Sequence, residues 1–281
     1  MKNKIVVLIA LAICFITFNG HATDIKISSE GDFNKERDLL LVQFDCKTDV
    51  DDLHTAAALA TILSDTLYSK INFHAVAGTY GIQKGLYVPP NDLMKLAFGN
   101  NWTDAHENFK NAIKKVNVIV KKTLLNDGDI WIAEAGQSDF TAELLRAIQT
   151  DMPNVDISKR FHVVQHSDWN EKTTTPEELL FVKNNTDYQK IPDGNAVGNG
   201  TPGFHDSEFK NWESKISDPK LLAIWRLAIK TSNKYNGQEG RYKNEAIFEG
   251  GLDFSDLSEV CWILGLKDLK DTEQFFNDYA K

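Results

Sequence analysis

Short apolar runs alternate along the chain with longer amphipathic segments. Residues 38–45, DLLLVQFD, form a continuous apolar run that ends in charge, which is typical of a buried strand. Residues 51–67 then carry apolar positions at helical spacing, with two acids in the first turn. Residues 71–81 predict a second strand that ends at Gly78. This order of strand, acidic loop, helix and strand predicts a βαβ unit.

The same alternation continues toward the C-terminus. Further strands are predicted over 128–136 and 160–167, and further helices over 106–125, 140–149, 175–183, 219–235 and 255–266. The pattern predicts an α/β fold, a mostly parallel Rossmann-like sheet with helices on both faces, whose ligands bind beyond the carboxyl ends of the strands. Residues 184–217 are polar, rich in Gly and Asn and without periodicity, which indicates a long loop such as a lid or a binding loop.

The N-terminus has the pattern of a secretory signal peptide. A basic start is followed by an apolar run at 5–18 and a small-residue exit at 20–22. The run is shorter than the ~20 residues that cross a bilayer. We therefore expect cleavage after Ala22, a protein exported to the periplasm or the medium, no stable membrane anchor, and one domain over 23–281, because no repeat or linker divides it.

Charge and cysteine content narrow the range of partners. Removal of 1–22 takes away two lysines and no acid, so the formal net charge moves from −9 to −11. An acidic chain repels phosphate backbones, so we expect no nucleic-acid partner, while a homo-oligomer stays open. Cys46 and Cys261 are expected to be buried free thiols, although a single bridge between them also stays open.

Residues 44–52, FDCKTDVDD, place four aspartates within eight positions, with Lys47 among them. Each like-charged pair at ~4 Å costs about 4 kcal/mol at an effective dielectric of about 20, so the cluster needs solvent or a cation. Carboxylate oxygens suit Ca²⁺. The alternatives are that Lys47 is the permanent cation, or that Asp51 and Asp52 only favour the helix N-terminus.

This stretch resembles the N-terminal fingerprint of the nucleoside hydrolases (inosine/uridine-preferring), which is a strand followed by Asp-x-Asp-x-x-x-Asp-Asp and a helix. Asp45 falls on the first acid, and Asp51 and Asp52 fall on the closing pair. Lys47 replaces the second acid, which in that family ligates calcium and is the favoured base for water. Asp49 stands where the family usually has glycine. The resemblance therefore implies Asp45 or Asp49 as the base.

Four later segments extend the resemblance, in the family's order, to about residue 265. AGQSDF is similar to the turn whose backbone carbonyl binds the metal, VAGTYG to a substrate-binding turn, SDWN with TPEEL to a ribose-binding stretch, and GGLDFSDLSEV to the segment with the last metal ligand. Asp256 is preferred there over Asp253. The resemblance implies metal ligands at Asp52, Ser138 and Asp256, and substrate contacts at Asp51, Thr79, Asp168, Trp169 and Asn170.

Taken together, the resemblance implies a calcium-assisted hydrolase of an N-glycosidic bond, acting on a nucleoside or sugar through an oxocarbenium-like transition state. His166 is the expected catalytic histidine, and His205 also lies near the site loops. The main alternative is an inactive relative that binds a nucleoside or carbohydrate, with Lys47 in place of the metal. A haloacid-dehalogenase-like phosphatase also begins strand-Asp-x-Asp, but Lys47 cannot serve as its acid.

Overall fold

The computed structural model describes residues 32–266 and 268–280. The predicted signal peptide at 1–22 therefore lies outside the described residues.

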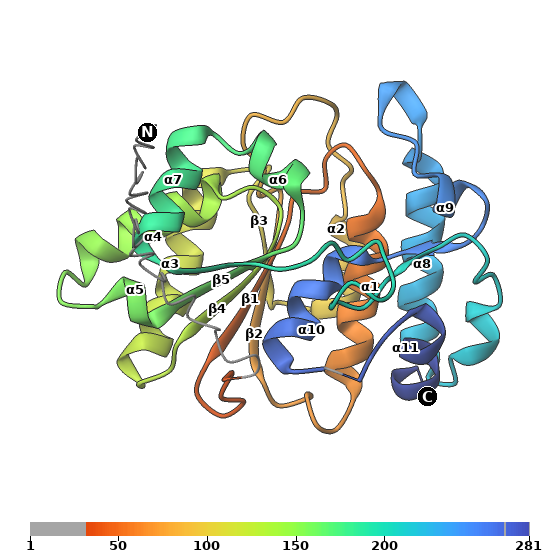
Figure 1. Cartoon of the computed structure of the whole chain (residues 1–281), viewed down its shortest axis with the longest axis horizontal. Coiled ribbons are helices and arrows are strands. Elements are labelled where there is room, and N and C mark those ends of the chain that lie inside the picture. The colour runs from red at the N-terminus through yellow and green to blue at the C-terminus, as the bar shows by residue number, and fades with distance from the viewer. Residues whose placement is uncertain (1–31, 267, 281) are drawn as a thin grey trace, which may run out of the picture.

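A six-stranded sheet, parallel throughout, forms the centre of the molecule (Figure 1). Across the sheet the strands are β3 (Trp102–Asp104), β2 (Asn72–Ala77), β1 (Leu39–Phe44), β4 (Ile130–Ala135), β5 (Phe161–Gln165) and β6 (Asp187–Lys190). This is the order of a Rossmann-type doubly wound sheet. Every residue of β1 and β4 is buried, which explains why both sequences are apolar except for Gln43 and Glu134. The predicted α/β fold is confirmed.

Helices cover both faces of the sheet. One face carries α3 (Phe109–Leu125), α4 (Asp139–Asp151), α5 (Ile157–Arg160) and α7 (Pro176–Asn185), and the other carries α1 (Asp51–Ser64), α2 (Asn91–Phe98) and α10 (Ser258–Leu264), as Figure 1 shows. Alternate residues of β1 enter the two cores: Leu39 and Leu41 pack with the first group, and Leu40, Val42 and Phe44 with the second. The central strand thus holds both layers together.

Helix α1 is enclosed by a further layer, made of α8 (Pro219–Tyr235), α9 (Glu245–Phe248) and α11 (Thr272–Tyr279). Every residue from Asp52 to Ile62 is buried. Polar groups on this helix find partners on α8: the Trp225 indole N–H donates to Thr61 Oγ1 at 2.9 Å, and His54 Nε2 lies 2.9 Å from Ser232 Oγ. A helix buried on all sides is held firmly, and its first turn carries Asp51 and Asp52.

The prediction of one long loop over 184–217 is partly wrong. It contains β6 and one strand of a small antiparallel pair, β7 (His205–Asp206) with β8 (Leu252–Asp253). Strand β6 reads Asp-Tyr-Gln-Lys and lies at the edge of the sheet with no fully buried residue, so it has no apolar alternation to detect. The pattern also did not predict α2, β3, α11 or the short helix α6 (Asp168–Thr173).

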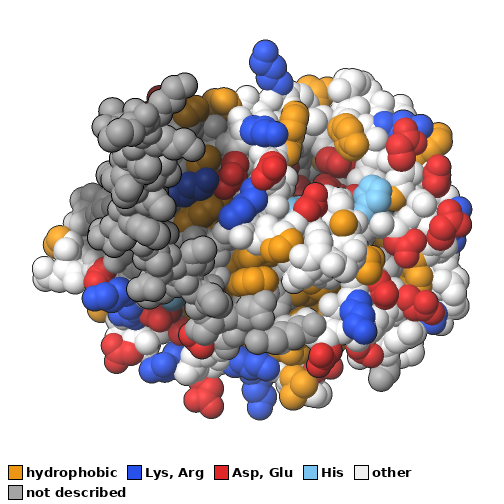
Figure 2. All heavy atoms as spheres, viewed as in Figure 1, with side chains coloured by type: hydrophobic (Ala, Val, Ile, Leu, Met, Phe, Trp, Pro, Cys, Tyr) orange, Lys and Arg blue, Asp and Glu red, His pale blue; other side chains and the backbone are white. Residues whose placement is uncertain are grey.

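Side chains of both charges are interspersed on the face drawn in Figure 2, where acidic and hydrophobic groups lie next to one another near the centre. Among the described residues, no helix has both the length and the apolar character needed to cross a bilayer. Cys46 and Cys261 are buried and free, as predicted.

His74 makes stability depend on pH. Burial, with a smaller effect from Lys115, lowers its pKa to about 4, and its Nε2 lies 2.8 Å from Thr103 Oγ1. A depressed pKa gives stability that is present above the unfolded value of 6.5 and is lost as the pH falls toward 4. At pH 5 this loss is about 2 kcal/mol.

We expect His74→Gln, which keeps a donor toward Thr103, to reduce the fall in unfolding free energy between pH 7 and pH 5 by about 2 kcal/mol. Urea unfolding at the two pH values measures it. The exposed His106→Gln is the control and should retain the wild-type difference. An unchanged difference in His74→Gln would show that folding does not lower the pKa of His74.

Candidate functional site

The site lies at the topological switch point of the sheet, between β1 and β4. From β1 the chain proceeds through α1 to β2 on one side, and it later returns to β4 on the other side, so the loops after β1 and β4 separate. A cavity of about 360 Å³ lies at this edge, within the size range of small-molecule sites. Its lining includes six carboxylates: Asp45, Asp49, Asp51, Asp52, Asp253 and Asp256.

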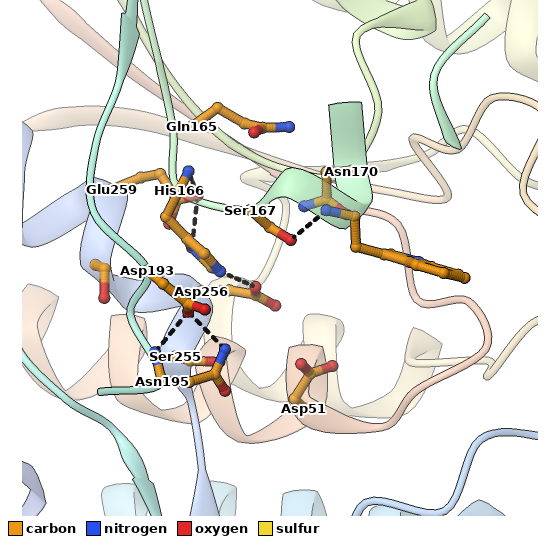
Figure 3. Close-up of polar contacts among 12 residues, drawn as sticks. Asp51, Gln165, His166, Ser167, Asn170, Asp193, Asn195, Ser255, Asp256 and Glu259 are labelled. Carbon is orange, nitrogen blue, oxygen red and sulfur yellow. Dashed lines mark hydrogen bonds and ion pairs between the residues drawn. The ribbon is translucent and has the colours of Figure 1, made fainter. Parts of the chain in front are cut away.

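Three of these acids converge. The first turn of α1 supplies Asp51 and Asp52, and the 3-10 helix Ser255–Leu257 supplies Asp256; one oxygen from each lies within 4.8 Å of the others. In Figure 3, Asp51 and Asp256 stand on either side of one space. Asp52 Oδ2 accepts the Cys46 N–H at 2.6 Å, and its buried Oδ1 receives no hydrogen bond from an N–H or hydroxyl group of the described chain. The carboxyl of Asp45 lies close enough to share a proton with Asp52 when one of the two is protonated. A buried carboxylate oxygen without such a donor is what a cation would satisfy.

Electrostatics in the triad favour a bound cation. Burial first, and then repulsion from neighbouring carboxylates, raises the pKa of Asp51, Asp52 and Asp256 well above the usual value for an aspartate. Without a cation the cluster must retain protons. A divalent ion would replace them, so its affinity should increase with pH.

Asp45 is held at the end of β1 by two donors. The Lys47 N–H donates to Oδ1 at 2.7 Å, and Gln137 Nε2 donates to Oδ2 at 2.7 Å. Gln137 also donates to Asn170 Oδ1 at 3.2 Å and accepts the Gly81 N–H at 3.1 Å. Burial raises the pKa of Asp45 to about 6, although these hydrogen bonds oppose the rise. Asp45 is therefore fixed in place and able to exchange a proton near neutral pH.

A second polar group forms the opposite wall. Asp253 Oδ2 accepts from His205 Nδ1 at 2.8 Å and from Asn244 Nδ2 at 2.7 Å. Although burial acts to raise it, these hydrogen bonds hold the pKa of Asp253 below the usual value. Asp253 is thus hydrogen-bonded to His205 and Asn244, whereas Asp256 lies close to Asp51 and Asp52. Asp49 lies beside them, and burial followed by repulsion from Asp253 raises its pKa to about 7.

His166 lies between two acids. Its Nδ1 is 2.9 Å from Glu259 Oε1 and its Nε2 is 3.8 Å from Asp256 Oδ1, as the dashed lines in Figure 3 mark. The side chain is 3% exposed and that of Glu259 is 0% exposed. His166 is in the site, as the sequence predicted, but both of its ring nitrogens face carboxylates.

The remaining predicted residues divide into two groups. Trp169 and Asn170, both on α6, line the cavity. Thr79, Ser138 and Asp168 are outside its lining, so the structure does not support their expected roles. The hydroxyl of Ser138 donates to Glu134 and its carbonyl accepts the Ala142 N–H of α4 at 2.8 Å. Thr79 is buried beneath the loops, and Asp168 is 81% exposed and paired with Lys190 at 3.1 Å.

Lys47 does not fill the triad. Its Nζ lies 4.0 Å from the centre of the Tyr80 ring, and within the described chain it forms no ion pair closer than 4.0 Å. The ammonium lines the cavity but is directed to an aromatic wall. The expectation that Lys47 takes the place of the metal is therefore not supported by the geometry.

Sequence reasoning missed Gln137, Asn244 and the partnership of His205 with Asp253. Gln137 follows Gly136 at the end of β4, a place where parallel sheets put ligand-facing groups, so its position could have identified it. Asn244 has no such signal, because it is the N-cap of a four-residue helix in an irregular segment.

Comparison with known proteins finds no matching family model, no matching curated protein and no matching solved structure.

Gln137 links four segments at this edge, so its loss should be costly. Gln137→Leu leaves the Gly81 N–H and two buried acceptors without their partner, at about 1–3 kcal/mol for each group. We expect a loss of about 3 kcal/mol or more in unfolding free energy, measured by urea titration. Gln149→Leu, at an exposed position of α4, is the control and should change it by less than about 0.5 kcal/mol. Equal effects would show that the Gln137 contacts are not stabilising.

Calcium binding at the triad can be tested by thermal unfolding of chelated protein. Millimolar Ca²⁺ at about 100 times its dissociation constant should add about 2.7 kcal/mol, or several degrees in Tm. Asp256→Asn should raise the Tm of the chelated protein, because it relieves repulsion, and should abolish the calcium shift. Asp127→Asn, an exposed change at a positive φ that asparagine also tolerates, should behave as wild type. A full shift in Asp256→Asn would place the ion elsewhere.

Proposed function

We propose that this protein hydrolyses the N-glycosidic bond of a nucleoside or related riboside, with a divalent cation, best matched by Ca²⁺, held by Asp51, Asp52 and Asp256. The observation that carries the proposal is the convergence of these carboxylates within 4.8 Å at the edge of the sheet, with one buried oxygen that no N–H or hydroxyl group of the described chain contacts. The resemblance of residues 44–52 to the nucleoside hydrolase fingerprint gives the reaction class.

The donor set fits calcium. All three ligands are hard carboxylate oxygens, and the cavity leaves room for sugar hydroxyls or water to complete the six to eight ligands that Ca²⁺ takes. When bound, the ion would supply positive charge that orients hydroxyl groups and acidifies water. Among the described residues the cluster contains carboxylates and no cysteine, which argues against a soft metal.

Asp45 is the best-placed base. Its carboxylate can take a proton from the attacking water, whose oxygen then forms the new bond to the anomeric carbon. The hydrogen bond from Gln137 keeps one carboxylate oxygen fixed, so the acid cannot turn away as substrate enters. A pKa of about 6 keeps Asp45 largely ionised at neutral pH and basic enough to accept the proton.

Substrate contacts come from the cavity rim. Asn170 and Asp49 present polar groups that can bind sugar hydroxyls, and Asn170 is oriented by Gln137. Trp169 and Tyr242 line the same cavity and are each more than half exposed, so they offer free aromatic surface to a planar leaving group. The oxocarbenium-like transition state would gain from the surrounding carboxylates, since they stabilise positive charge on the sugar.

The competing function is ligand binding without turnover. The observation that favours it is Lys47, which stands where the resemblance expects the carboxylate that ligates calcium and serves as the base for water. Export through the predicted signal peptide suits either function and remains a proposal from the sequence.

The test is release of free sugar from inosine, uridine and adenosine, with calcium and with chelator. We expect calcium-dependent turnover, a loss of about 10²-fold or more in kcat for Asp45→Asn, and no loss for the distant Asp127→Asn. Calorimetry with the same nucleosides separates the competing function. Saturable binding without sugar release would identify a binding protein, and neither binding nor release would reject both functions.

A further inference from the structure

Lys47 is the only lysine or arginine among the described residues that line the cavity. Six carboxylates line the same cavity, yet the Lys47 ammonium forms no ion pair closer than 4.0 Å with any carboxylate of the described chain. Its positive charge is therefore available to a bound ligand.

The backbone holds the base of this side chain in a fixed place. The Lys47 N–H donates to Asp45 Oδ1 at 2.7 Å, Gln83 Nε2 donates to the Lys47 carbonyl, and Lys47 forms an antiparallel bridge with Tyr87. Farther out, Nζ lies 4.0 Å from the centre of the Tyr80 ring. A cation–π contact at a partly exposed site is weaker than a hydrogen bond from a charged donor, so the flexible stem can move the ammonium from the ring to an anion at little cost.

Hydroxyl groups lie beside this lysine. Thr48 lines the cavity, and its Oγ1 accepts the Tyr242 N–H at 3.2 Å, which leaves the hydroxyl proton to be donated to a ligand. Tyr242 lines the cavity too and is 58% exposed. Lys47, Thr48 and Tyr242 thus offer a cation and hydroxyl donors together, a combination that binds phosphate and carboxylate groups.

A neutral riboside gains nothing from the lysine. In the proposed reaction positive charge develops on the sugar, and an ammonium in the same cavity opposes it, whereas the carboxylates stabilise it. The ammonium is favourable only when the substrate brings negative charge of its own. The carboxylates repel such a substrate, and the divalent ion proposed at the triad offsets that repulsion.

We propose that Lys47 is a specificity-determining residue that binds a negatively charged group of the substrate, so that the preferred substrates are anionic ribosides. This rests on the proposed hydrolase function and narrows its substrate class. The negative group is a phosphate on the sugar or a carboxylate on the base, since an ammonium binds either one. The lysine that departs from the fingerprint thereby acquires a role of its own.

The test compares anionic ribosides with their neutral parents. Inosine 5′-monophosphate is paired with inosine, and orotidine, which carries a carboxylate on the base, is paired with uridine. We expect the wild type to favour the anionic member of at least one pair, and Lys47→Gln to lower that preference in kcat/KM about 10–100-fold. The loss should appear mainly in KM, because the ammonium binds the ground state and the transition state alike. Lys84→Gln, at an exposed position outside the cavity lining, is the matched control and should keep the wild-type preference.

Two further variants separate a direct contact from a structural role. Lys47→Asp places an acid where the fingerprint has one, and we expect it to reverse the preference: kcat/KM should fall on the anionic riboside and rise on its neutral parent. Lys47→Arg keeps the charge and should retain a preference for the anionic member. Equal losses on both members of each pair, as a merely structural role predicts, would overturn the assignment.

The two pairs also identify the negative group. A loss of preference confined to the inosine pair identifies a sugar phosphate, and one confined to the uridine pair identifies a base carboxylate. A preference that is the same in the wild type and in Lys47→Gln on both pairs overturns the role of Lys47 and leaves the hydrolase function in place. A wild type that cleaves none of these compounds overturns both.

Ionic strength gives a second measurement that needs no variant. The preference of the wild type for the anionic member should fall as salt is raised from about 0.05 M to about 0.5 M, because salt screens the attraction between the half-buried ammonium and the substrate. A preference that does not change with salt would contradict an ionic contact.

Discussion

Repulsion among buried carboxylates is the constraint on which the rest of the site depends. Asp45, Asp52, Asp253 and Asp256 are almost fully buried around one cavity, and each charged pair costs on the order of 4 kcal/mol at ~4 Å and an effective dielectric of about 20. Backbone N–H groups of Cys46, Lys47 and Ser255 and the amides of Gln137 and Asn244 offset part of this cost. The triad receives the fewest such donors, which is why protons or a cation must complete it.

The fold keeps these acids together against their repulsion. The carboxyl ends of β1 and β4 fix the two loops, and α1 cannot retreat from the cavity because α8 covers its outer side. Ser255–Leu257 leads into α10, which packs on β4 and β5 from the same face. The acids are therefore positioned by buried elements, so that ligand or proton binding need not order a mobile segment first.

The part of the site that the sequence could predict is local. Strand, acidic loop and helix follow one another within residues 39–64, so hydrophobic pattern and charge were enough to expect Asp45, Asp51 and Asp52 together. Asp256 could be proposed as a member of the cluster only from the resemblance of its segment to that of the nucleoside hydrolases. The His205–Asp253 pair joins residues 48 apart through two-residue strands that have no periodicity, and no pattern predicts such a register. Ser138 and Thr79 lie outside the cavity lining for a related reason: a strand end predicts which loop faces the ligand, but not which side chain of that loop reaches it.

Lys47 and Asp49 are best considered together, because both depart from the fingerprint that the loop resembles. Relative to the fingerprint that the loop resembles, a lysine replaces an acid and an aspartate replaces a glycine, so the loop carries one unit less negative charge. The lysine is directed to Tyr80, and the added carboxylate of Asp49 faces the cavity beside Asp253. The charge of Asp49 also acts on the triad, because it is the strongest repulsion on Asp51 and adds to the repulsion on Asp52. The exchange therefore leaves a high density of negative charge on both sides of the cavity, and the need for protons or a cation persists whichever way Lys47 is directed.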